Sequence, residues 1–301
     1  MPVERYNVGL IQMCCGPEPD ENLSRAMAKI REAAKMGANI VCLPELFSTQ
    51  YFCQREDAAL FDLAEAVPGP TTEALSKTAR ESKVVVVGSV FEKRTRGIYH
   101  NTAVMIDADG ALRGMYRKMH IPDDPLYYEK FYFTPGDLGF KAFDTAVGRV
   151  GTLVCWDQWY PEGARITALQ GANLIFYPTA IGWHPAEKAE FGAVQHDAWR
   201  TIQRAHSIAN GVFVAVVNRV GHENGNVRGN IAPAGQGLEF WGGSFLSDAF
   251  GRVLVEGSHD REEILIGEVN LKDLEDVRRN WPFLRDRRIE SYGGITQRFI
   301  D

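Results

Sequence analysis

One eight-residue pattern occurs twice in this chain of 301 residues, and it constrains the fold more than any other sequence feature. Gly37-Ala-Asn-Ile-Val-Cys-Leu-Pro44 returns as Gly171-Ala-Asn-Leu-Ile-Phe-Tyr-Pro178, and each copy follows a segment with helical spacing of its apolar residues. Each copy also precedes a strand-turn-strand pattern, at residues 102–112 and 243–253. A short string can recur by chance, but the matching elements around it favour two similar halves.

Short apolar runs alternate with helical patterns along the whole chain, which is typical of a layered α/β architecture. Near the N-terminus, a helix is predicted over residues 22–36 and a strand over 39–43. We expect Asp20 or Asn22 to cap this helix and Gly37 to end it. The two halves are expected to pack their sheets face to face with the helices outside, as an α-β-β-α sandwich with two pseudo-symmetric halves.

The chain is predicted to form a single domain over residues 1–301, because no stretch has the composition of a linker. The polar segment 221–230 is predicted to be a mobile surface loop. Residues 281–301 mix aromatic residues with arginines, and we expect this C-terminal tail to contact a neighbouring subunit of a homo-oligomer.

Composition and charge exclude several classes of function. The 33 Lys and Arg residues against 39 Asp and Glu residues give a net charge of −6, without the basic excess of a nucleic-acid-binding protein. No apolar run approaches membrane-spanning length, and the first residues do not resemble a secretory leader. The five cysteines have no paired spacing, so reduced thiols are expected. These features favour a cytoplasmic protein that binds neither nucleic acid nor membrane.

Cys155 differs from the other cysteines in its position between elements. It follows an apolar strand at 150–154 and precedes a polar, aromatic turn at 156–162, with a helix expected from Gly163. Backbone N–H groups at such an elbow favour a thiolate and can bind an oxyanion, as a nucleophile requires. The alternative is an inert buried thiol, which describes Cys42, inside a strand, better. It also describes Cys14, Cys15 and Cys53 better.

Two acids lie in unusually apolar surroundings, and a lysine between them in the sequence could act with them. Glu45 stands at a strand end between apolar neighbours, where open α/β folds collect their chemistry, and a buried carboxylate could accept a thiol proton. Lys118 follows the first hairpin and could stabilise an oxyanion, and Glu129 lies among aromatic residues. Each could equally be an ordinary solvated residue. None of the seven histidines forms a telling motif with the cysteine, although His120 is close to Lys118.

Taken together and in this order, these tracts resemble the nitrilase, or carbon–nitrogen hydrolase, superfamily over essentially the whole chain. The glutamate motif reads Leu43-Pro-Glu-Leu-Phe47, the lysine motif Tyr116-Arg-Lys-Met-His120, and the cysteine motif Val154-Cys-Trp-Asp-Gln-Trp-Tyr-Pro-Glu162. Each motif alone is weak, whereas the ordered set is specific.

The resemblance implies a Glu-Lys-Cys site that forms a cysteine acyl-enzyme and needs no metal or organic cofactor. By this likeness Cys155 attacks, Glu45 is the general base, Lys118 positions the oxyanion, Glu129 orients the site, and the Trp156 amide completes the oxyanion hole. The implied oxyanion and substrate-binding residues are Trp156, Tyr51, His120, Trp159, Ala180 and Trp183.

Within the superfamily, the likeness is closest to the N-carbamoylputrescine amidases, which release putrescine, carbon dioxide and ammonia. It rests on Ile121-Pro-Asp, on Glu129-Lys-Phe-Tyr-Phe-Thr-Pro-Gly-Asp137, on Cys155-Trp-Asp-Gln-Trp159 and on Tyr177-Pro-Thr-Ala-Ile-Gly182. Relatives that act on carbamoyl amino acids carry an arginine soon after the nucleophile, where this chain has Gln158 and Trp159. The resemblance therefore implies a small-molecule carbamoyl amine or amide as substrate.

The chain departs from this pattern directly after Gly182. Many carbamoylputrescine amidases have an acid there, suited to a substrate ammonium, whereas this chain has Trp183-His184-Pro185. The acids that could replace it are Glu187, Glu190, Asp123 and Asp124, unless Trp183 holds the cation on its ring face.

Three other interpretations stay open at this point. The first is another hydrolase of the superfamily, such as a β-ureidopropionase, an omega-amidase or an aliphatic amidase. The second is a binding protein of the same fold without catalysis, although the Glu, Lys and Cys are all present. The third, a nucleotide-binding α/β protein, lacks its glycine fingerprint.

Overall fold

The computed structural model describes residues 4–233 and 237–300, whose strands form two six-stranded sheets and one three-stranded sheet. The first sheet has the order β15-β1-β2-β3-β4-β5 and the second the order β14-β13-β10-β8-β7-β6. The strands of the first sheet are β1 Arg5–Gln12, β2 Ile40–Cys42, β3 Val85–Thr95, β4 Ile98–Ile106, β5 Leu112–Arg117 and β15 Glu263–Asn270. Those of the second are β6 Ala142–Thr145, β7 Gly148–Thr152, β8 Leu174–Pro178, β10 Phe213–Val217, β13 Phe245–Ser247 and β14 Val253–Glu256. The small sheet contains β9 Gly182–Trp183, β11 Val220–Glu223 and β12 Leu238–Trp241.

The two large sheets have the same internal plan. β1, β2 and β3 are parallel neighbours, as are β7, β8 and β10, and each set continues into an antiparallel hairpin, β4-β5 or β13-β14. The repeated eight-residue strings supply β2 and β8, which occupy equivalent positions. The prediction of two similar halves is confirmed.

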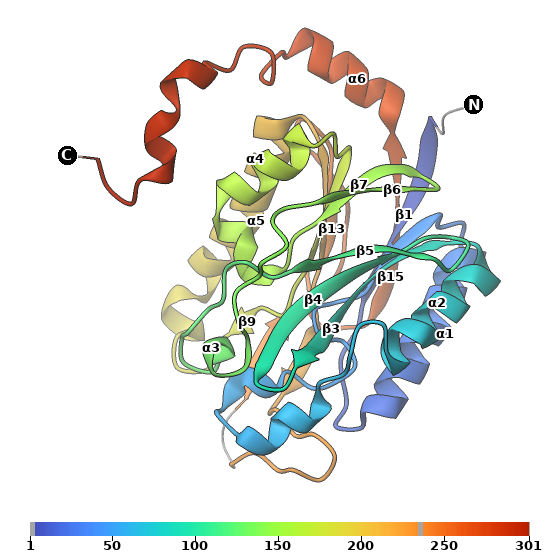
Figure 1. The fold of residues 1–301 in the computed structure, drawn as a ribbon, viewed down its shortest axis with the longest axis vertical. Coiled ribbons are helices and arrows are strands. Elements are labelled where there is room, and N and C mark those ends of the chain that lie inside the picture. Colours follow the sequence, from blue (N-terminus) through green and yellow to red (C-terminus); the bar gives the residue numbers. More distant parts are fainter. Residues whose placement is uncertain (1–3, 234–236, 301) are drawn as a thin grey trace.

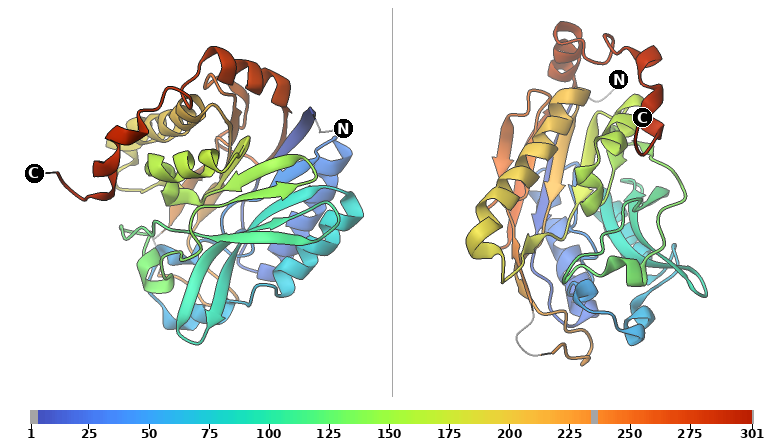
Figure 2. Two further views of the ribbon diagram at one scale, coloured as in Figure 1. Left: turned by 45° about the horizontal axis from the view of Figure 1, so that its top comes forward. Right: turned by 90° about the vertical axis from the view of Figure 1, so that its left-hand side faces the viewer.

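Helices cover the outer face of each sheet, and the sheets pack against each other (Figure 2). The side chains of β2 alternate as expected for a strand, because Ile40 and Cys42 enter the core between the sheets while Val41 packs under α1 and α2. On the second sheet, Leu174 faces the same central core and Ile175 packs under α4 and α5. The predicted α-β-β-α sandwich is thus confirmed. The helices are α1 Pro19–Lys35, α2 Pro70–Ser82, α3 Glu129–Tyr132, α4 Pro161–Leu169, α5 Lys188–Asn210 and α6 Leu271–Asn280.

Several predicted boundaries are wrong. The cap of α1 is Glu18, so that Asp20 and Asn22 lie inside the helix. Asn22 instead holds the preceding loop, since its side-chain amide exchanges hydrogen bonds of 2.8 and 2.7 Å with the backbone of Gly16. Gly37 does follow the end of the helix, with φ of 96°. The helix expected from Gly163 begins two residues earlier, at a proline, which suits a first helical turn.

The segment 221–230 is not a free loop, because its first residues belong to β11 and pair with β12. Glu223 and Val227 are buried. Residues 281–300 extend from α6 across one end of the sandwich, through the short 3-10 helices Ile289–Ser291 and Gly293–Thr296 (Figure 1). In the part of the chain that the structure describes, no helix combines the length and the apolar character needed to cross a membrane.

Candidate active site

The predicted acid, lysine and cysteine each lie just beyond a strand end. Glu45 follows β2, Lys118 directly follows β5, and Cys155 follows β7. The side chains of Glu45 and Lys118 have no solvent-exposed surface, and Cys155 is 4% exposed. The charges of Glu45 and Lys118 act on the pKa of the Cys155 thiol, so residues from both halves of the chain meet in one buried place.

Lys118 bridges two buried carboxylates. Its Nζ atom donates to Glu45 Oε1 over 2.8 Å and to Glu129 Oε2 over 2.7 Å. Burial by itself would lower the pKa of Lys118, but the charges of Glu129 and Glu45 outweigh it and hold that pKa well above its ordinary value. Lys118 therefore remains an ammonium, and two of its three N–H bonds are used.

Glu129 stands at the start of the four-residue helix α3 and is buried. Tyr51 donates its hydroxyl to Glu129 Oε1 over 2.7 Å, while Lys118 donates to the other oxygen. Burial raises the pKa of Glu129 to about 7 against the opposing charge of Lys118. Tyr51, which was predicted to bind substrate, therefore holds Glu129 in place by a hydrogen bond.

The turn that carries Glu45 is fixed by a buried arginine of the second half. Arg219 donates to the carbonyl oxygen of Glu45 over 2.8 and 3.1 Å and to that of Leu46 over 2.6 Å. Leu46 adopts φ of 50°, in the left-handed region that non-glycine residues rarely occupy. Arg219 is itself paired with Glu223 over 2.8 Å. The Arg219–Glu223 ion pair therefore fixes the strained turn at Glu45 and Leu46.

Cys155 opens the 3-10 helix Cys155–Trp159 with φ of 43°, and its Sγ atom lies 3.8 Å from the carbonyl oxygen of Ala180. Burial raises the pKa of the Cys155 thiol well above its ordinary value, and the charge of Glu45 raises it further. Desolvation therefore outweighs the effect expected from the local N–H groups on the pKa of this thiol. A thiol of this kind needs a base to become a nucleophile.

Asp157, which the sequence analysis did not single out, organises this turn. Its carboxylate accepts the Val154 N–H over 2.9 Å, the Tyr116 hydroxyl over 2.8 Å and the His120 N–H over 3.0 Å. Nδ1 of His120 also lies 2.7 Å from the same carboxylate, and the ring stacks on Tyr160. His120 is therefore part of the support of the cysteine turn. The signal available in the sequence was an acid two residues after the predicted nucleophile.

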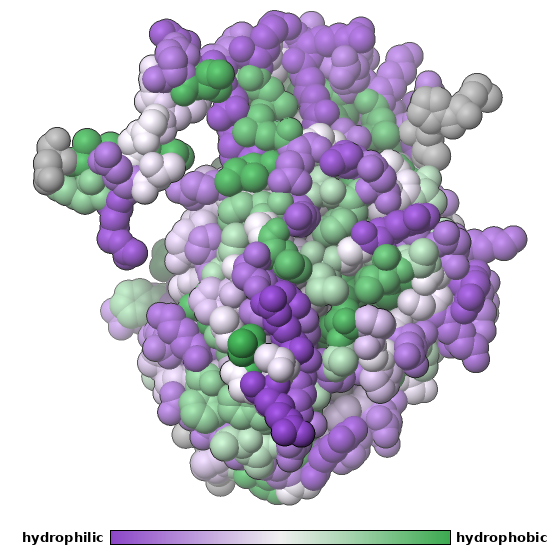
Figure 3. Space-filling model, in the orientation of Figure 1, coloured by the Kyte–Doolittle hydropathy of each residue, from purple (hydrophilic) through white to green (hydrophobic). Residues whose placement is uncertain are grey.

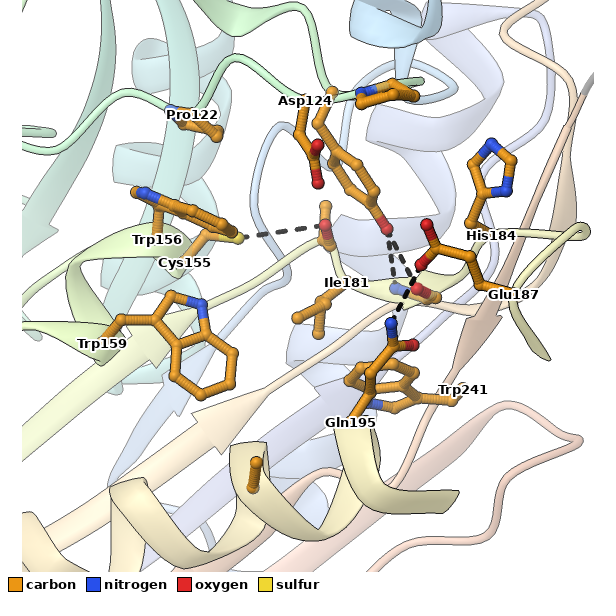
Figure 4. A pocket seen from close by; sticks show the side chains of 15 residues that line it. Pro122, Asp124, Cys155, Trp156, Trp159, Ile181, His184, Glu187, Gln195 and Trp241 are labelled. Carbon is orange, nitrogen blue, oxygen red and sulfur yellow. Dashed lines mark hydrogen bonds between the residues drawn. The ribbon is translucent and has the colours of Figure 1, made fainter. Parts of the chain in front are cut away.

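A cavity of about 260 Å³ opens onto Cys155. Of the predicted binding residues, Trp156, Trp159 and Ala180 line it (Figure 4). Trp183 lies behind the lining, where its indole N–H donates to the carbonyl oxygen of Gly192 over 3.0 Å. A cation does occupy its ring face, but it is the protein's own Lys188, 4.6 Å from the ring centroid.

Two acids line the cavity and form its acidic side. Asp124 and Glu187 line it, together with Gln195 and His184, and Gln195 Nε2 donates to Glu187 Oε2 over 3.0 Å (Figure 4). Among the lining residues that the structure describes there is no lysine or arginine. Gln195 belongs to none of the sequence motifs, so its place in the cavity could not be predicted from the sequence.

The loop that follows β8 is pinned from two directions. Tyr127 donates its hydroxyl to the carbonyl oxygen of Gly182 over 3.1 Å and accepts the Gly182 N–H over 3.0 Å. Asn218 bonds both backbone groups of Ile181. The cavity wall next to Cys155 is therefore fixed by side chains of both halves.

The profile of the family described as Carbon-nitrogen hydrolase matches residues 7–279. The chain belongs to the carbon–nitrogen hydrolase family. This carbon–nitrogen hydrolase is 40% identical to an N-carbamoylputrescine amidase of Oryza sativa subsp. japonica, over 96% of this chain and 93% of that protein. It is 37% identical to a citrullinase of Francisella tularensis subsp. tularensis, over 97% and 98%.

Among solved structures, this carbon–nitrogen hydrolase superposes on a carbon–nitrogen hydrolase from Helicobacter pylori G27 with a TM-score of 0.91. The two are 45% identical, and the match covers 98% of this chain and 100% of the other. Nit3 of Saccharomyces cerevisiae, 23% identical, shares the fold with a TM-score of 0.76 and coverage of 95% and 97%. The protein is thus an amidase-type enzyme of this family that acts on small molecules.

Proposed function

We propose that this enzyme hydrolyses the carbamoyl group of N-carbamoylputrescine, or of a closely similar carbamoylated amine, through a covalent intermediate on Cys155. The observation that carries the proposal is the joint burial of Glu45, Lys118 and Cys155 next to a cavity that Cys155, Asp124 and Glu187 line. The products are putrescine, carbon dioxide and ammonia.

In the first step, Glu45 accepts the thiol proton and the sulfur of Cys155 adds to the carbamoyl carbon. The oxygen of that carbon gains negative charge, which the third N–H of Lys118 and the backbone N–H of Trp156 stabilise. Glu45 then returns the proton to the departing amine. Two donated hydrogen bonds already hold Lys118 in place, so that the ammonium need not reorganise during the step.

In the second step, water attacks the S-carbamoyl group with Glu45 again acting as base. The C–S bond breaks, the thiol regains its proton, and carbamic acid leaves and decomposes to carbon dioxide and ammonia. Glu129 and Tyr51 touch no reacting atom in this scheme. They orient Lys118 through the bond to Glu129 Oε2.

The charge of the cavity supports a cationic substrate. Asp124 and Glu187 both line the cavity that opens onto Cys155, and Glu187 lies across it from the cysteine, so a carbamoylated diamine would place its ammonium near these acids (Figure 4). Two acids in an otherwise largely apolar cavity favour an alkyl chain with a terminal ammonium. These two acids take the place of the acid that this chain lacks directly after Gly182.

Citrulline is the second candidate, because the Francisella citrullinase is nearly as similar as the plant amidases. Citrulline carries a carboxylate besides its ammonium, and the described lining supplies no lysine or arginine to pair with it. Two carboxylates near that group would repel it. The lining therefore favours the carbamoylated diamine.

The test is ammonia release from N-carbamoylputrescine, citrulline, N-carbamoyl-β-alanine and short aliphatic amides, by the wild type and by Cys155→Ala. We expect the highest kcat/KM on N-carbamoylputrescine and no turnover by the variant. A preference for citrulline or for N-carbamoyl-β-alanine would contradict the proposed substrate and leave the chemistry intact. Activity that survives in Cys155→Ala would contradict the mechanism.

A further inference from the structure

The two carboxylate oxygens of Glu45 have opposite environments. Oε1 accepts from Lys118 Nζ over 2.8 Å and from Asn101 Nδ2 over 2.6 Å. Oε2 is equally buried and has no hydrogen-bond partner among the described residues. A buried acceptor without a partner is costly, so this asymmetry requires a reason.

The orientation of the Asn101 amide follows from a chain of hydrogen bonds with one possible direction. The backbone N–H of Leu46 can only donate, and it donates to Ser89 Oγ over 3.2 Å. Ser89 in turn directs its own hydroxyl proton to Asn101 Oδ1, 3.1 Å away. With its oxygen engaged by Ser89, the amide presents its NH₂ group to Glu45 Oε1. The chain thus starts at the residue next to Glu45 and returns to the Glu45 carboxylate.

All members of this chain are buried and lie on rigid elements. Ser89 belongs to β3 and Asn101 to β4, and these strands are paired neighbours. The backbone carbonyl oxygen of Asn101 also accepts the backbone N–H of Lys118 over 2.9 Å. One residue therefore contacts both the glutamate and the lysine, through separate atoms.

We propose that Asn101, oriented by Ser89, is a positioning residue that confines the proton of Glu45 to Oε2. This inference rests on the proposed role of Glu45 as general base. Because Oε1 faces two donors, a proton on that oxygen would meet the N–H groups of Asn101 and Lys118 head-on. The proton taken from Cys155 must then reside on Oε2, from which it is returned to the leaving amine. Oε2, the oxygen without a hydrogen-bond partner, is therefore the atom that accepts and returns the proton.

The experiment compares Asn101→Asp, Ser89→Ala and a matched control, Asn210→Asp, on whichever carbamoyl or amide compound the wild type hydrolyses fastest. Asn210 is a buried amide that donates to the carbonyl oxygen of His206, within α5 and on a different element from Glu45 and Lys118. For each protein, kcat and KM are measured from pH 6 to pH 9, and folding is checked by thermal unfolding.

We expect Asn101→Asp to lower kcat at pH 8 by about tenfold or more with little change in KM, because a second carboxylate replaces a donor to Oε1. At lower pH the new carboxyl is protonated and donates again, so the rate relative to the wild type should rise by about threefold or more. Ser89→Ala frees the amide to invert and should lower kcat by about threefold to tenfold at every pH. The Asn210→Asp control should keep the kcat of the wild type.

A rate ratio of Asn101→Asp to the wild type that is independent of pH, with kcat no lower than in the control, would overturn the inference. If Asn101→Asp does not fold, Ser89→Ala decides, and an unchanged kcat in that variant would be equally contrary. The substrate proposal is tested separately, because these comparisons use any compound that the wild type hydrolyses. A wild type inactive on every carbamoyl compound, but active on amides, would refute that proposal and leave this test in place.

Discussion

The buried acid–lysine cluster and the acidic side of the cavity differ in how firmly they are held. In the cluster, Glu45, Lys118 and Glu129 are fully buried, and each is bonded to side chains on other elements. On the acidic side, Glu187 is exposed, and the hydrogen bond to its carboxylate comes from Gln195 within the same helical segment. On the face drawn in Figure 3, hydrophilic residues surround several hydrophobic patches. We therefore propose that the chemistry is built into the sandwich, whereas recognition lies on a segment that can change without disturbing it.

The contacts behind the acidic side support this contrast. Lys188 lies over the ring of Trp183 and pairs with Glu239 over 2.5 Å, and both charged side chains are nearly half exposed. Exposed ion pairs of this kind contribute little to stability. Substitutions in the segment 184–195 should therefore alter substrate preference, while those in the cluster should abolish turnover.

The largest effect is expected at the cluster. Glu45→Gln, Lys118→Met and Cys155→Ala each remove a group that we propose to act in the transition state, and kcat should fall by about 10³-fold or more in each. A steady-state assay with the best carbamoyl substrate measures this. Cys14→Ala, which changes a half-buried thiol bonded to Glu262, is the control and should keep the wild-type kcat. A Glu45→Gln enzyme with more than a tenth of the wild-type rate would contradict the assignment of the base.

The second prediction concerns Glu129, whose pKa burial raises to about 7. Below that pH the protonated carboxyl holds Lys118 less firmly, so kcat/KM should fall as the pH drops through about 7. Glu129→Gln should remove this limb and lower the plateau by about tenfold to a hundredfold. A pH profile of both proteins from pH 5 to 9 measures it. An acid limb that persists unchanged in the variant would assign it to another group.

The same shift has a consequence for stability. Because the pKa of Glu129 rises from its ordinary value of 4.5 to about 7, the folded protein keeps a proton that the unfolded chain has released between these pH values. The stabilisation from this group is complete below about pH 4.5 and is lost as the pH rises through about 7. The melting temperature of Glu129→Gln relative to the wild type should therefore rise across this window, and a constant difference would contradict the raised pKa.

The third prediction concerns the acidic side. Glu187→Gln should raise KM for N-carbamoylputrescine by about threefold to tenfold and leave kcat for a short neutral amide unchanged, because it removes a charge and keeps the size. Glu190→Gln makes the same change three residues further along, at a residue outside the described lining, and serves as the control. Equal effects of the two substitutions would mean that the acids act only through the general field of the surface.

The fold and the residues at the strand ends could be predicted because they depend on local patterns. The repeated string at 37–44 and 171–178 gave both the equivalence of β2 and β8 and the place of Glu45 at a strand end. The position of Cys155 at an elbow was visible for the same reason. What could not be predicted was its protonation, since the pKa of the thiol depends on burial between two sheets.

The supporting residues were missed for a related reason. Asn101 and Ser89 lie inside β4 and β3 and read as ordinary strand residues, and Arg219 reaches Glu45 from a segment 174 positions away. Their roles come from register and from the packing of one half on the other. His120 and Trp183 show the converse, because a motif placed them near the site while tertiary contacts directed them to Asp157 and Gly192.

The smallest effect on catalysis is expected from the tail, residues 281–301, which we propose to contact a neighbouring subunit. Its exposed apolar side chains include Phe283, Ile295 and Phe299. A stop after Asn280 would retain α6, whose Leu274 is buried in the central core, so the sandwich should still fold. We expect the mass measured by light scattering to fall to that of a smaller assembly, while kcat changes by less than about twofold, because the tail contributes no residue to the described cavity lining. Ile295→Asp combined with Phe299→Asp keeps the full length and should give the same loss of mass. An unchanged assembly in both variants would place the subunit contact elsewhere, and a large loss of kcat in a folded variant would mean that the contact also shapes the site.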